Sequence, residues 1–378
     1  MQNGIVSSLG IPDAVLGRAR QAAREIGDSV ARLGGAVDVD ADEILTGRAG
    51  LLGIAPAGHI SAGGATRLLP ARDGWCALTL SRDDDMETVP ALLETDDRPT
   101  DAWAAVGSAA ADRDAAEFVA RARLLDMPAA VLGEVSPAPP RFVRSGPAAA
   151  RQLPGLLVAD LSSMWAGPLC GHLLAAAGAT VVKVESVGRP DGTRRGDRRF
   201  FDWMNASKLS YAADLGNDSV RRLIEAADVV IEGSRPSALA GRGLTPGQIR
   251  PRGGRVWLRI TGYGTAGERA HRVAFGDDAA VAGGLVAPGP GFVGDAIADP
   301  LTGLEAARAV LESLRRGGGE TVEIALAEVA AGYAASPQAI ESERPAPPRV
   351  PTVSTRAADL GADNQQVHAL VKSRLASC

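Results

Sequence analysis

The stretch "GLLVADLSSMWAGPLCGHLLAAAGATVVKVE", residues 155–185, decides the fold. It begins with a continuous apolar run at 155–161, which is typical of a strand buried on both faces of a parallel sheet. A helical segment rich in Ala and Leu follows and ends near Gly178, because glycine favours helix C-termini. A second strand is predicted at 180–185. Strand, helix and strand in this order predict a right-handed βαβ unit.

The same alternation continues toward the C-terminus. A helix is predicted at 218–227, and further strands are predicted at 228–234 and 254–261. Strands that alternate with helices usually pair in a parallel sheet that has helices on both faces. We therefore predict an α/β protein with a Rossmann-like open parallel sheet domain.

The N-terminal part has a different pattern. Apolar residues at helical spacing predict a helix at 11–33, whereas residues 34–70 are Gly-rich and less regular. Short strands are predicted at 74–81 and 128–134, and the acidic segment 82–90 is predicted to be a turn. These elements favour a second, smaller α+β domain.

Domain boundaries are predicted from changes in composition. A segment rich in Pro, Arg and Gly at 135–155 is predicted to be a linker, and the tail from about 336 is predicted to extend over the surface. The predicted regions are a smaller domain at 1–150, a Rossmann-like domain at 151–335 and an extended tail at 336–378.

The composition limits the class of function. The chain has 378 residues and a formal net charge of −5, so no overall basic field indicates a nucleic-acid partner. Its three cysteines form no CxxC pair, which argues against a zinc site and for a reducing compartment. We find neither a signal-peptide pattern nor an apolar run long enough to span a membrane. We expect a cytoplasmic protein without a metal site.

The clearest helix is predicted at 299–316, with Asp299 at its N-cap and Pro300 in its first position. Most aspartates in this position only cap the helix. The same geometry also suits chemistry, because the free N–H groups of a helix N-terminus favour an ionised carboxylate. An ionised carboxylate can attack a thioester. The local pattern favours a capping role for Asp299 and leaves a role as nucleophile open.

Three further segments carry candidate groups. The loop 186–201 has five arginines, which either pair with neighbouring aspartates or hold a nucleotide phosphate. The turn "WAGPLCG" at 165–171 is not a GxGxxG motif, but its backbone can line a ligand. Asp277 and Asp278 are predicted to cap a turn, with an acid/base partner of Asp299 as the alternative. The arginines of the loop are Arg189, Arg194, Arg195, Arg198 and Arg199.

Residues 155–330 resemble the family III CoA-transferases in six stretches that occur in the family's order. The stretches are "LLVADLSSMWAGPLCGHLLAAAGATVVKVE", "NASKLSYAADL", "ADVVIEGSRPSAL", "ITGYGTAG", "FGDDAAVAGGL" and "AIADPLTGLEAARAVLESLRRGGGETVEIALAE". The resemblance implies that coenzyme A is a substrate and that no prosthetic group is needed. It also implies that Asp299 is the family's nucleophilic aspartate, which forms an acyl anhydride and then a CoA thioester.

The resemblance extends to candidate CoA contacts. The turn of Trp165, Ala166 and Gly167 would lie against CoA. Lys208, in "NASKLS", matches a basic position near the nucleotide, and Arg235, in "GSRPSAL", lies beside a segment that lines CoA in the family.

Three departures from the family pattern affect these expectations. Asp277 stands where racemases of the family carry a histidine, and Ser186 stands where transferases carry an arginine, for which Arg189 is the candidate replacement. The segment 63–85 resembles the family's smaller domain, which usually follows the Rossmann half, so the domain order is predicted to be permuted. The family forms interlocked dimers, and a homodimer is expected here.

The main hypothesis is a CoA-transferase that moves CoA between an acyl-CoA and a carboxylic acid acceptor. Asp299 is the nucleophile, Asp277 orients a substrate or handles a proton, and the Gly283–Gly284 turn supplies N–H groups to the oxyanion. One alternative is an isomerase or racemase that acts beside the thioester. Another is a non-catalytic acyl-CoA-binding partner of a related chain.

Overall fold

The computed structural model describes residues 9–336 and 347–376. Within these ranges the larger sheet has seven strands in the order β4-β10-β9-β8-β5-β6-β7. Neighbouring strands run parallel, except that β4 pairs antiparallel with β10 at one edge. The strands are β4 (Arg141–Arg144), β5 (Leu157–Asp160), β6 (Thr180–Glu185), β7 (Leu209–Ala212), β8 (Val229–Glu232), β9 (Val256–Thr261) and β10 (Glu320–Ala325).

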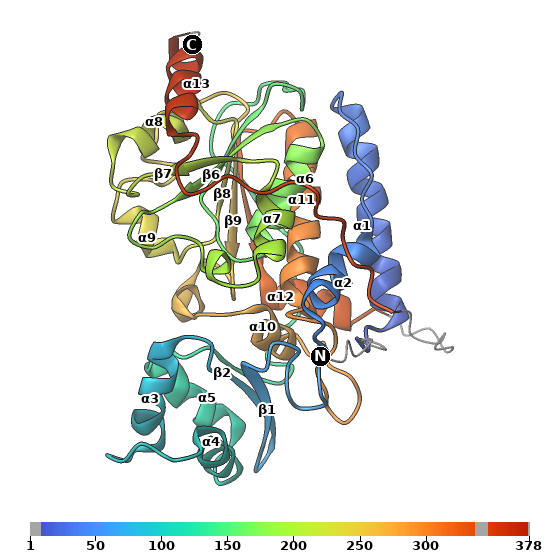
Figure 1. Ribbon diagram of the computed structural model, residues 1–378, viewed down its shortest axis with the longest axis vertical. Helices are drawn as coiled ribbons and strands as arrows, with labels where there is room; N and C mark the ends of the chain where they lie inside the picture. Colours follow the sequence, from blue (N-terminus) through green and yellow to red (C-terminus); the bar gives the residue numbers. More distant parts are fainter. Residues whose placement is uncertain (1–8, 337–346, 377–378) are drawn as a thin grey trace.

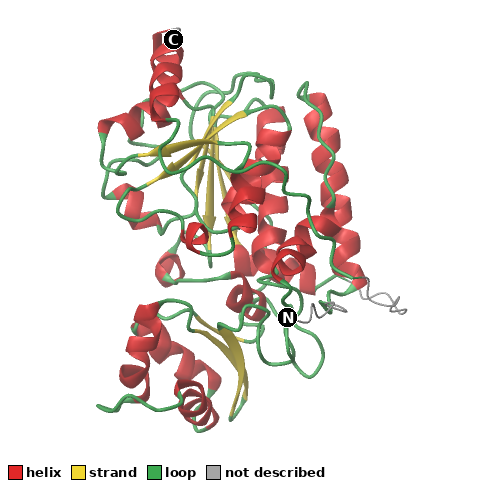
Figure 2. Ribbon diagram, in the orientation of Figure 1, coloured by secondary structure: helices red, strands yellow, loops and turns green. Residues whose placement is uncertain are grey.

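Helices cover both faces of this sheet (Figures 1 and 2). One face packs against α1 (Asp13–Arg32), α6 (Ala166–Ala176), α11 (Ala298–Arg315) and α12 (Leu326–Ala334), and the other against α8 (Asp218–Ala226), α9 (Pro236–Ala240) and α13 (Asn364–Ala376). No helix of the described ranges is long and apolar enough to cross a bilayer. The three layers confirm the predicted α/β class and the open, mostly parallel sheet.

A smaller unit lies at one end of the large sheet (Figure 1). It combines the antiparallel strands β1 (Thr66–Ala71), β2 (Gly74–Thr79) and β3 (Ala129–Val131) with the helices α3 (Asp83–Leu93), α4 (Ala102–Ala111) and α5 (Ala115–Leu124). Its sheet packs on α10 (Gly276–Ala282), where Ala77 and Val281 share one apolar cluster. This unit confirms the predicted second α+β domain.

The first two helices pack on the large half. Buried residues of α1 repeat at helical spacing, and α1 packs against α11 together with α2 (Ala41–Leu52). Residues 13–52 therefore belong to the core of the large half, although the predicted region 1–150 groups them with the small unit. The domain boundaries and the permuted order stay predictions.

The remaining short helices are η1 (Gly192–Arg195), α7 (Arg198–Asn205) and η2 (Gly267–His271).

Four local predictions were wrong. The acidic segment at 82–90 is part of α3, because Asp85 accepts hydrogen bonds from the backbone of Ser81 and Arg82 and starts a helix. The Gly-rich stretch 34–70 contains α2 and β1, and the predicted linker contains β4. Residues 364–376 of the predicted extended tail form α13, whose Val367 and Val371 pack into the core beside α8.

Candidate active site

Asp299 lies in the first turn of α11 and does not cap that helix. The helix begins at Ala298, one residue earlier than predicted, and the backbone N–H of Asp299 donates to the Ala296 carbonyl. The Asp299 carboxylate instead lies close to the backbone N–H groups of Ala166 and Gly276, which lower its pKa. These are the first residues of α6 and α10. The carboxylate therefore sits where the N-termini of α6, α10 and α11 converge, and unpaired helix N–H groups favour negative charge there.

Two glycines allow this convergence. A Cβ at Gly276 would lie 2.2 Å from the Ala296 carbonyl oxygen and 2.5 Å from Asp299 Oδ2. A Cβ at Gly303, one turn along α11 from Asp299, would lie 2.6 Å from Leu169 Cδ2 and 2.9 Å from the Ala166 carbonyl oxygen. Glycine at these positions lets α6 and α10 approach the start of α11 closely enough to hold the Asp299 side chain.

A group of carboxylates surrounds this point. Asp277 Oδ1 accepts a hydrogen bond of 3.0 Å from the backbone N–H of Ala296. Asp295, in the turn before α11, forms an ion pair of 2.6 Å with Arg48 of α2. The Arg48 guanidinium also lies 5.5 Å from the ring centroid of Trp165. One arginine from the N-terminal part thus reaches a cluster of three aspartates, namely Asp277, Asp295 and Asp299.

This environment raises the pKa of both predicted catalytic carboxylates and thereby favours their neutral forms. Burial raises the pKa of Asp299 to about 7, against the lowering effects of Arg48 and of the two backbone donors. Burial, followed by the charges of Asp295 and Asp299, raises the pKa of Asp277 to about 7. Both side chains keep some exposed surface. A carboxylate that titrates near pH 7 and still reaches solvent is suited to nucleophilic or proton-transfer chemistry.

Asp278 has a different role from its neighbour Asp277. It has no accessible surface, and it accepts hydrogen bonds from the backbone N–H of Phe275 at 2.8 Å and from Thr79 Oγ1 at 3.2 Å. Thr79 belongs to β2, so Asp278 fastens the start of α10 to the small sheet. Of the two candidate carboxylates in "FGDD", the structure therefore brings only Asp277 to Asp299.

The predicted oxyanion donors are not available. The N–H of Gly283 donates to the Ala279 carbonyl and the N–H of Gly284 donates to the Val281 carbonyl, at the C-terminal end of α10. The backbone donors at Asp299 come instead from the first residues of α6 and α10.

Comparison with known proteins assigns the family. The model of the CoA-transferase family III matches residues 153–366, which is more than half of the chain. The chain belongs to family III of the CoA-transferases. The matched region includes Asp277, Asp295 and Asp299, whereas Arg48 lies outside it.

The chain spans about half the length of the curated relatives it matches. It is 31% identical over 201 residues to the succinyl-CoA–D-citramalate CoA-transferase of Chloroflexus aurantiacus, which is 47% of this chain and 50% of that one. It is 32% identical over 207 residues to the succinate–glutarate CoA-transferase of Agrobacterium fabrum, covering 47% and 49%. The crystal structure of Rv3272 from Mycobacterium tuberculosis aligns with 31% identity and a TM-score of 0.44, covering 50% and 56%.

The turn predicted to contact CoA lies beside Asp299 in this family III chain. Trp165 is buried and packs edge-to-face on Phe200, with ring centroids 5.2 Å apart. Its indole nitrogen has no hydrogen-bond partner among the described residues. The N–H of Ala166 faces Asp299 and lowers its pKa, and Gly167 lies against Ser162, whose Oγ would be 2.2 Å from a Cβ at position 167.

Lys208 and Arg235 are engaged in ion pairs. The Lys208 ammonium is fully buried, 2.9 Å from Asp160 Oδ2, and donates to the Pro168 carbonyl at 2.8 Å. Arg235 is exposed and pairs with Asp126 of the small unit at 2.5 Å. The structure places neither residue in contact with the carboxylate cluster.

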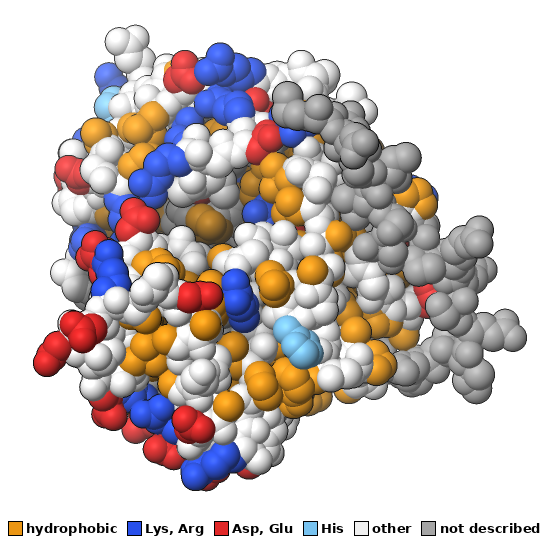
Figure 3. Space-filling view, turned by 60° about the horizontal axis from the view of Figure 1, so that its bottom comes forward, with side chains coloured by type: hydrophobic (Ala, Val, Ile, Leu, Met, Phe, Trp, Pro, Cys, Tyr) orange, Lys and Arg blue, Asp and Glu red, His pale blue; other side chains and the backbone are white. Residues whose placement is uncertain are grey.

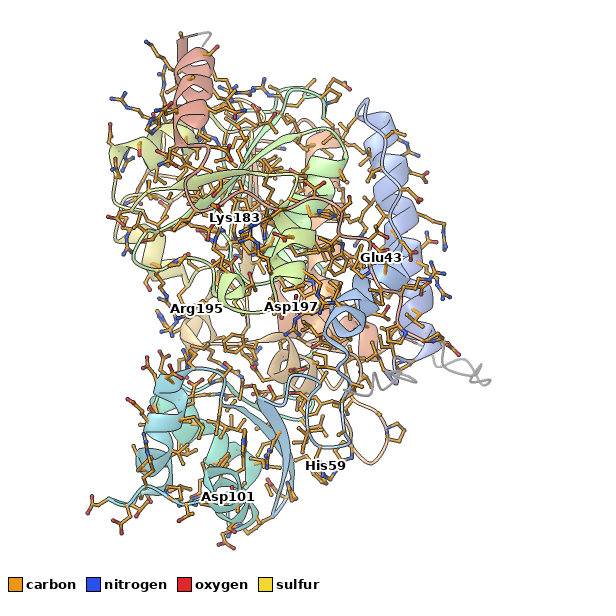
Figure 4. The ribbon with its side chains drawn as sticks, viewed as in Figure 1. Glu43, His59, Asp101, Lys183, Arg195 and Asp197 are labelled. Carbon is orange, nitrogen blue, oxygen red and sulfur yellow. The ribbon has the colours of Figure 1, made fainter. Side chains whose placement is uncertain are left out.

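Three of the five loop arginines form the ion pairs that were one of the two predicted alternatives. Arg194 pairs with Glu185, Arg198 with Asp202 and Arg199 with Asp197. Arg189 and Arg195 are exposed and form no ion pair within residues 9–336 and 347–376. Arg195 and Asp197 lie on the side of the large half that faces the small unit (Figure 4).

The surface at this end of the molecule is hollowed. Figure 3 shows a depression near the middle of the face that carries the small unit, with Lys and Arg side chains along one side of it. Cationic side chains at the rim of such a depression suit an anionic ligand.

Arg48, like its partner Asp295, is a site residue that the sequence did not reveal. It lies in "ADEILTGRAGLL", within the stretch predicted to be irregular, and no local motif marks it. The available signal was a single arginine in an otherwise apolar helical turn, since a partly buried cation needs an anionic partner.

Proposed function

We propose that this chain moves CoA between an acyl-CoA thioester and a carboxylic acid, with Asp299 as the nucleophile. The observation that carries the proposal is the Asp299 carboxylate held by the N–H groups of Ala166 and Gly276, at three converging helix N-termini. The family membership supports it. The named activities of the relatives, which act on succinyl-CoA and on organic acids, support this substrate class.

The chemistry proceeds through two kinds of covalent intermediate. A carboxylate oxygen of Asp299 attacks the thioester carbonyl, and the C–S bond of the tetrahedral adduct breaks, so that CoA leaves as a thiolate and a mixed anhydride of Asp299 and the acyl group remains. The thiolate attacks the Asp299 carbonyl carbon, which releases the donor acid and leaves an aspartyl-CoA thioester. The acceptor carboxylate then attacks this thioester, which displaces the CoA thiolate and gives a second mixed anhydride between Asp299 and the acceptor. The thiolate attacks the acceptor carbonyl of that anhydride, which forms the new acyl-CoA and releases the Asp299 carboxylate.

The site assists these steps electrostatically. Backbone N–H groups from α6 and α10 hold the carboxylate without needing to reorganise, and such fixed donors stabilise charge effectively at a partly dry site. Asp277 lies close enough to influence the charge of Asp299, and we propose that it orients the acceptor acid or carries a proton.

We propose that CoA enters along the arginine loop. Arg189 and Arg195 would hold its phosphates, because both are exposed and unpaired within the described residues. The turn of Trp165, Ala166 and Gly167 would form the wall beside the thioester, where the unpartnered indole N–H points to a polar ligand atom. Lys208 and Arg235 would act through their ion pairs by holding the surrounding segments. The expected homodimer is kept as a proposal that sedimentation velocity tests.

Covalent trapping tests the proposal. The protein is incubated with a panel of acyl-CoAs and quenched with hydroxylamine, and its peptides are analysed by mass spectrometry. A hydroxamate on the peptide containing Asp299, absent from Asp299→Asn, is the expected result. CoA binding without any adduct at Asp299 would contradict the transferase mechanism.

The isomerase alternative has its own support. Asp277 and Asp299 both have a pKa raised to about 7 by burial, which suits proton transfer at a carbon beside a thioester. Uptake of deuterium from D₂O into an acyl-CoA, without an acceptor acid and without an Asp299 adduct, would favour this reaction.

A further inference from the structure

The N-terminal helix α2 delivers a cation to the site from outside the region that matches the family. Its N-cap Asp40 accepts hydrogen bonds from the backbone N–H groups of Asp42 and Glu43, which fixes the start of the helix. Gly47 packs against Trp203 of α7, with room only for a glycine, since a Cβ would lie 2.7 Å from the indole ring. The adjacent Arg48 is thereby directed toward the aspartate cluster.

Arg48 is held by aromatic rings as well as by charge. Its guanidinium carbon lies 5.5 Å from the ring centroid of Trp165 and 5.3 Å from that of Phe200. Trp165 immediately precedes Ala166, the residue whose backbone N–H faces Asp299 and lowers its pKa. Contacts of this kind stabilise a cation without neutralising it. The charge of Arg48 therefore remains available to the carboxylates.

Asp295 depends on Arg48. Its side chain is 1% exposed, its Oδ1 pairs with Arg48 at 2.6 Å, and its Oδ2 has no hydrogen-bond partner among the described residues. A buried carboxylate without a cation would be strongly unfavourable. It would also act on Asp277 and Asp299, since the charge of Asp295 acts on both.

The charged groups that face Asp299 in the described residues come from three elements. Asp277 lies on α10 with Asp278 behind it, Asp295 lies in the turn before α11, and Arg48 lies on α2. The element α6 contributes the Ala166 N–H. Negative charge therefore outweighs positive charge around the nucleophile, and the balance is sensitive to Arg48.

We propose that Arg48 is a positioning residue for the reaction at Asp299: by pairing with Asp295, it keeps the Asp299 carboxylate in its ionised, attacking form near neutral pH. This inference rests on the proposed function, because it assigns Arg48 a role in the same covalent chemistry. Arg48 acts through charge and through Asp295, and it makes no bond to the acyl group.

A series of variants that remove or keep the charges of Arg48 and Asp295 tests this role. The rate of Asp299 adduct formation is measured from pH 5 to 9 for Arg48→Met, Arg48→Lys, Asp295→Asn and the double variant Arg48→Met/Asp295→Asn. Arg48→Met should raise the midpoint of the pH profile by about one unit and slow the reaction about tenfold below it. Arg48→Lys should keep the midpoint near that of the wild type. The double variant should move the midpoint back down from that of Arg48→Met, because the unpaired charge is gone.

The outcomes separate this role from a purely structural one. A uniform loss of rate in Arg48→Met with an unchanged midpoint would overturn the inference, and so would a double variant that keeps the raised midpoint. If Arg48→Met does not fold, Asp295→Asn alone decides, because it should lower the midpoint.

A direct titration separates this inference from the proposed function. Absence of an Asp299 adduct in the wild type would count against the proposed function. The carboxylate of Asp299 can then still be titrated by ¹³C NMR of Asp-labelled protein, with Asp299→Asn assigning the signal. A raised midpoint in Arg48→Met supports the role of Arg48, and an unchanged one overturns it.

Discussion

The Asp299 carboxylate lies against the backbone of Gly276 so closely that a Cβ at position 276 would be 2.5 Å from Asp299 Oδ2. The N–H of Gly276 is one of the two backbone N–H groups that lie close to that carboxylate and lower its pKa. A nucleophile and the first residue of a neighbouring helix are thus fitted to each other without room for a side chain.

Gly276→Ala should therefore damage the site. The added methyl group must displace either Asp299 or the Ala296 carbonyl, and a displacement of this size at a reacting group can reduce the rate about a hundredfold. Adduct formation at Asp299 is the measurement. Gly107→Ala is the matched control, since this helical glycine has open space around its Cβ position and should keep full reactivity. Equal reactivity in Gly276→Ala would contradict the close fit.

Asp277→Asn should stabilise the protein at neutral and high pH. Burial raises the pKa of Asp277 to about 7, so the folded state binds this proton more tightly than the unfolded state does. The stability that the proton on Asp277 gives the folded state is fully present below pH 4 and is lost as the pH rises to about 7. Asparagine keeps the hydrogen bond from Ala296 without the charge, so we expect a gain of roughly 1–3 kcal/mol at pH 8 and a smaller one at pH 4.

Urea unfolding at the two pH values checks this prediction, with the exposed Asp218→Asn as the control. A gain in the free energy of unfolding that does not depend on pH would mean that the folded protein does not disfavour the ionised form of Asp277.

Arg189→Gln and Arg195→Gln should weaken CoA binding. Each removes an exposed guanidinium that has no ion pair in the described residues, and we expect a loss of about threefold to tenfold in affinity at low salt for each. Arg199→Gln is the control in the same loop, because Arg199 already pairs with Asp197 at 2.7 Å. Calorimetric titration with CoA and with pantetheine separates the phosphates from the rest of the ligand. Equal losses for pantetheine would argue against phosphate contacts.

Lys208→Met should lower stability rather than CoA affinity. The substitution leaves Asp160 buried without its cation, and breaking a buried pair of this kind costs about 3–5 kcal/mol. Lys208→Met/Asp160→Asn should recover part of the loss in chemical denaturation. A stable Lys208→Met protein with weakened CoA binding would instead assign Lys208 to the nucleotide site.

The large sheet was predictable because its strands are buried on both faces. The continuous apolar run at 155–161 is typical of such a strand, and the structure forms β5 there and β6 at the strand predicted for 180–185. The predicted bounds of α11 lie within one residue of the observed ones. The capping role predicted for Asp299 was wrong, because its side chain faces α6 and α10 rather than the backbone of its own helix. Local capping preference cannot anticipate partners that are distant in sequence.

The carboxylate cluster was only partly predictable. Asp277 and Asp299 were identified through the family resemblance, and the structure brings them together. Arg48 and Asp295 were missed, because the ion pair joins positions that are 247 residues apart and neither lies in a local motif. Helix α2 was also missed, since its two glycines and its low contrast between polar and apolar faces hide its helical period.

Isotope transfer to Asp299 tests the central claim most directly. The protein is incubated with an ¹⁸O-labelled carboxylic acid and an acyl-CoA identified in the trapping panel. The mass of the peptide that contains Asp299 is then measured by mass spectrometry. In each cycle the covalent mechanism passes one oxygen of the acid to the Asp299 carboxylate, so this peptide should gain about 2 Da after one turnover and approach a gain of about 4 Da after many. Turnover that leaves the mass of the Asp299 peptide unchanged would contradict the account.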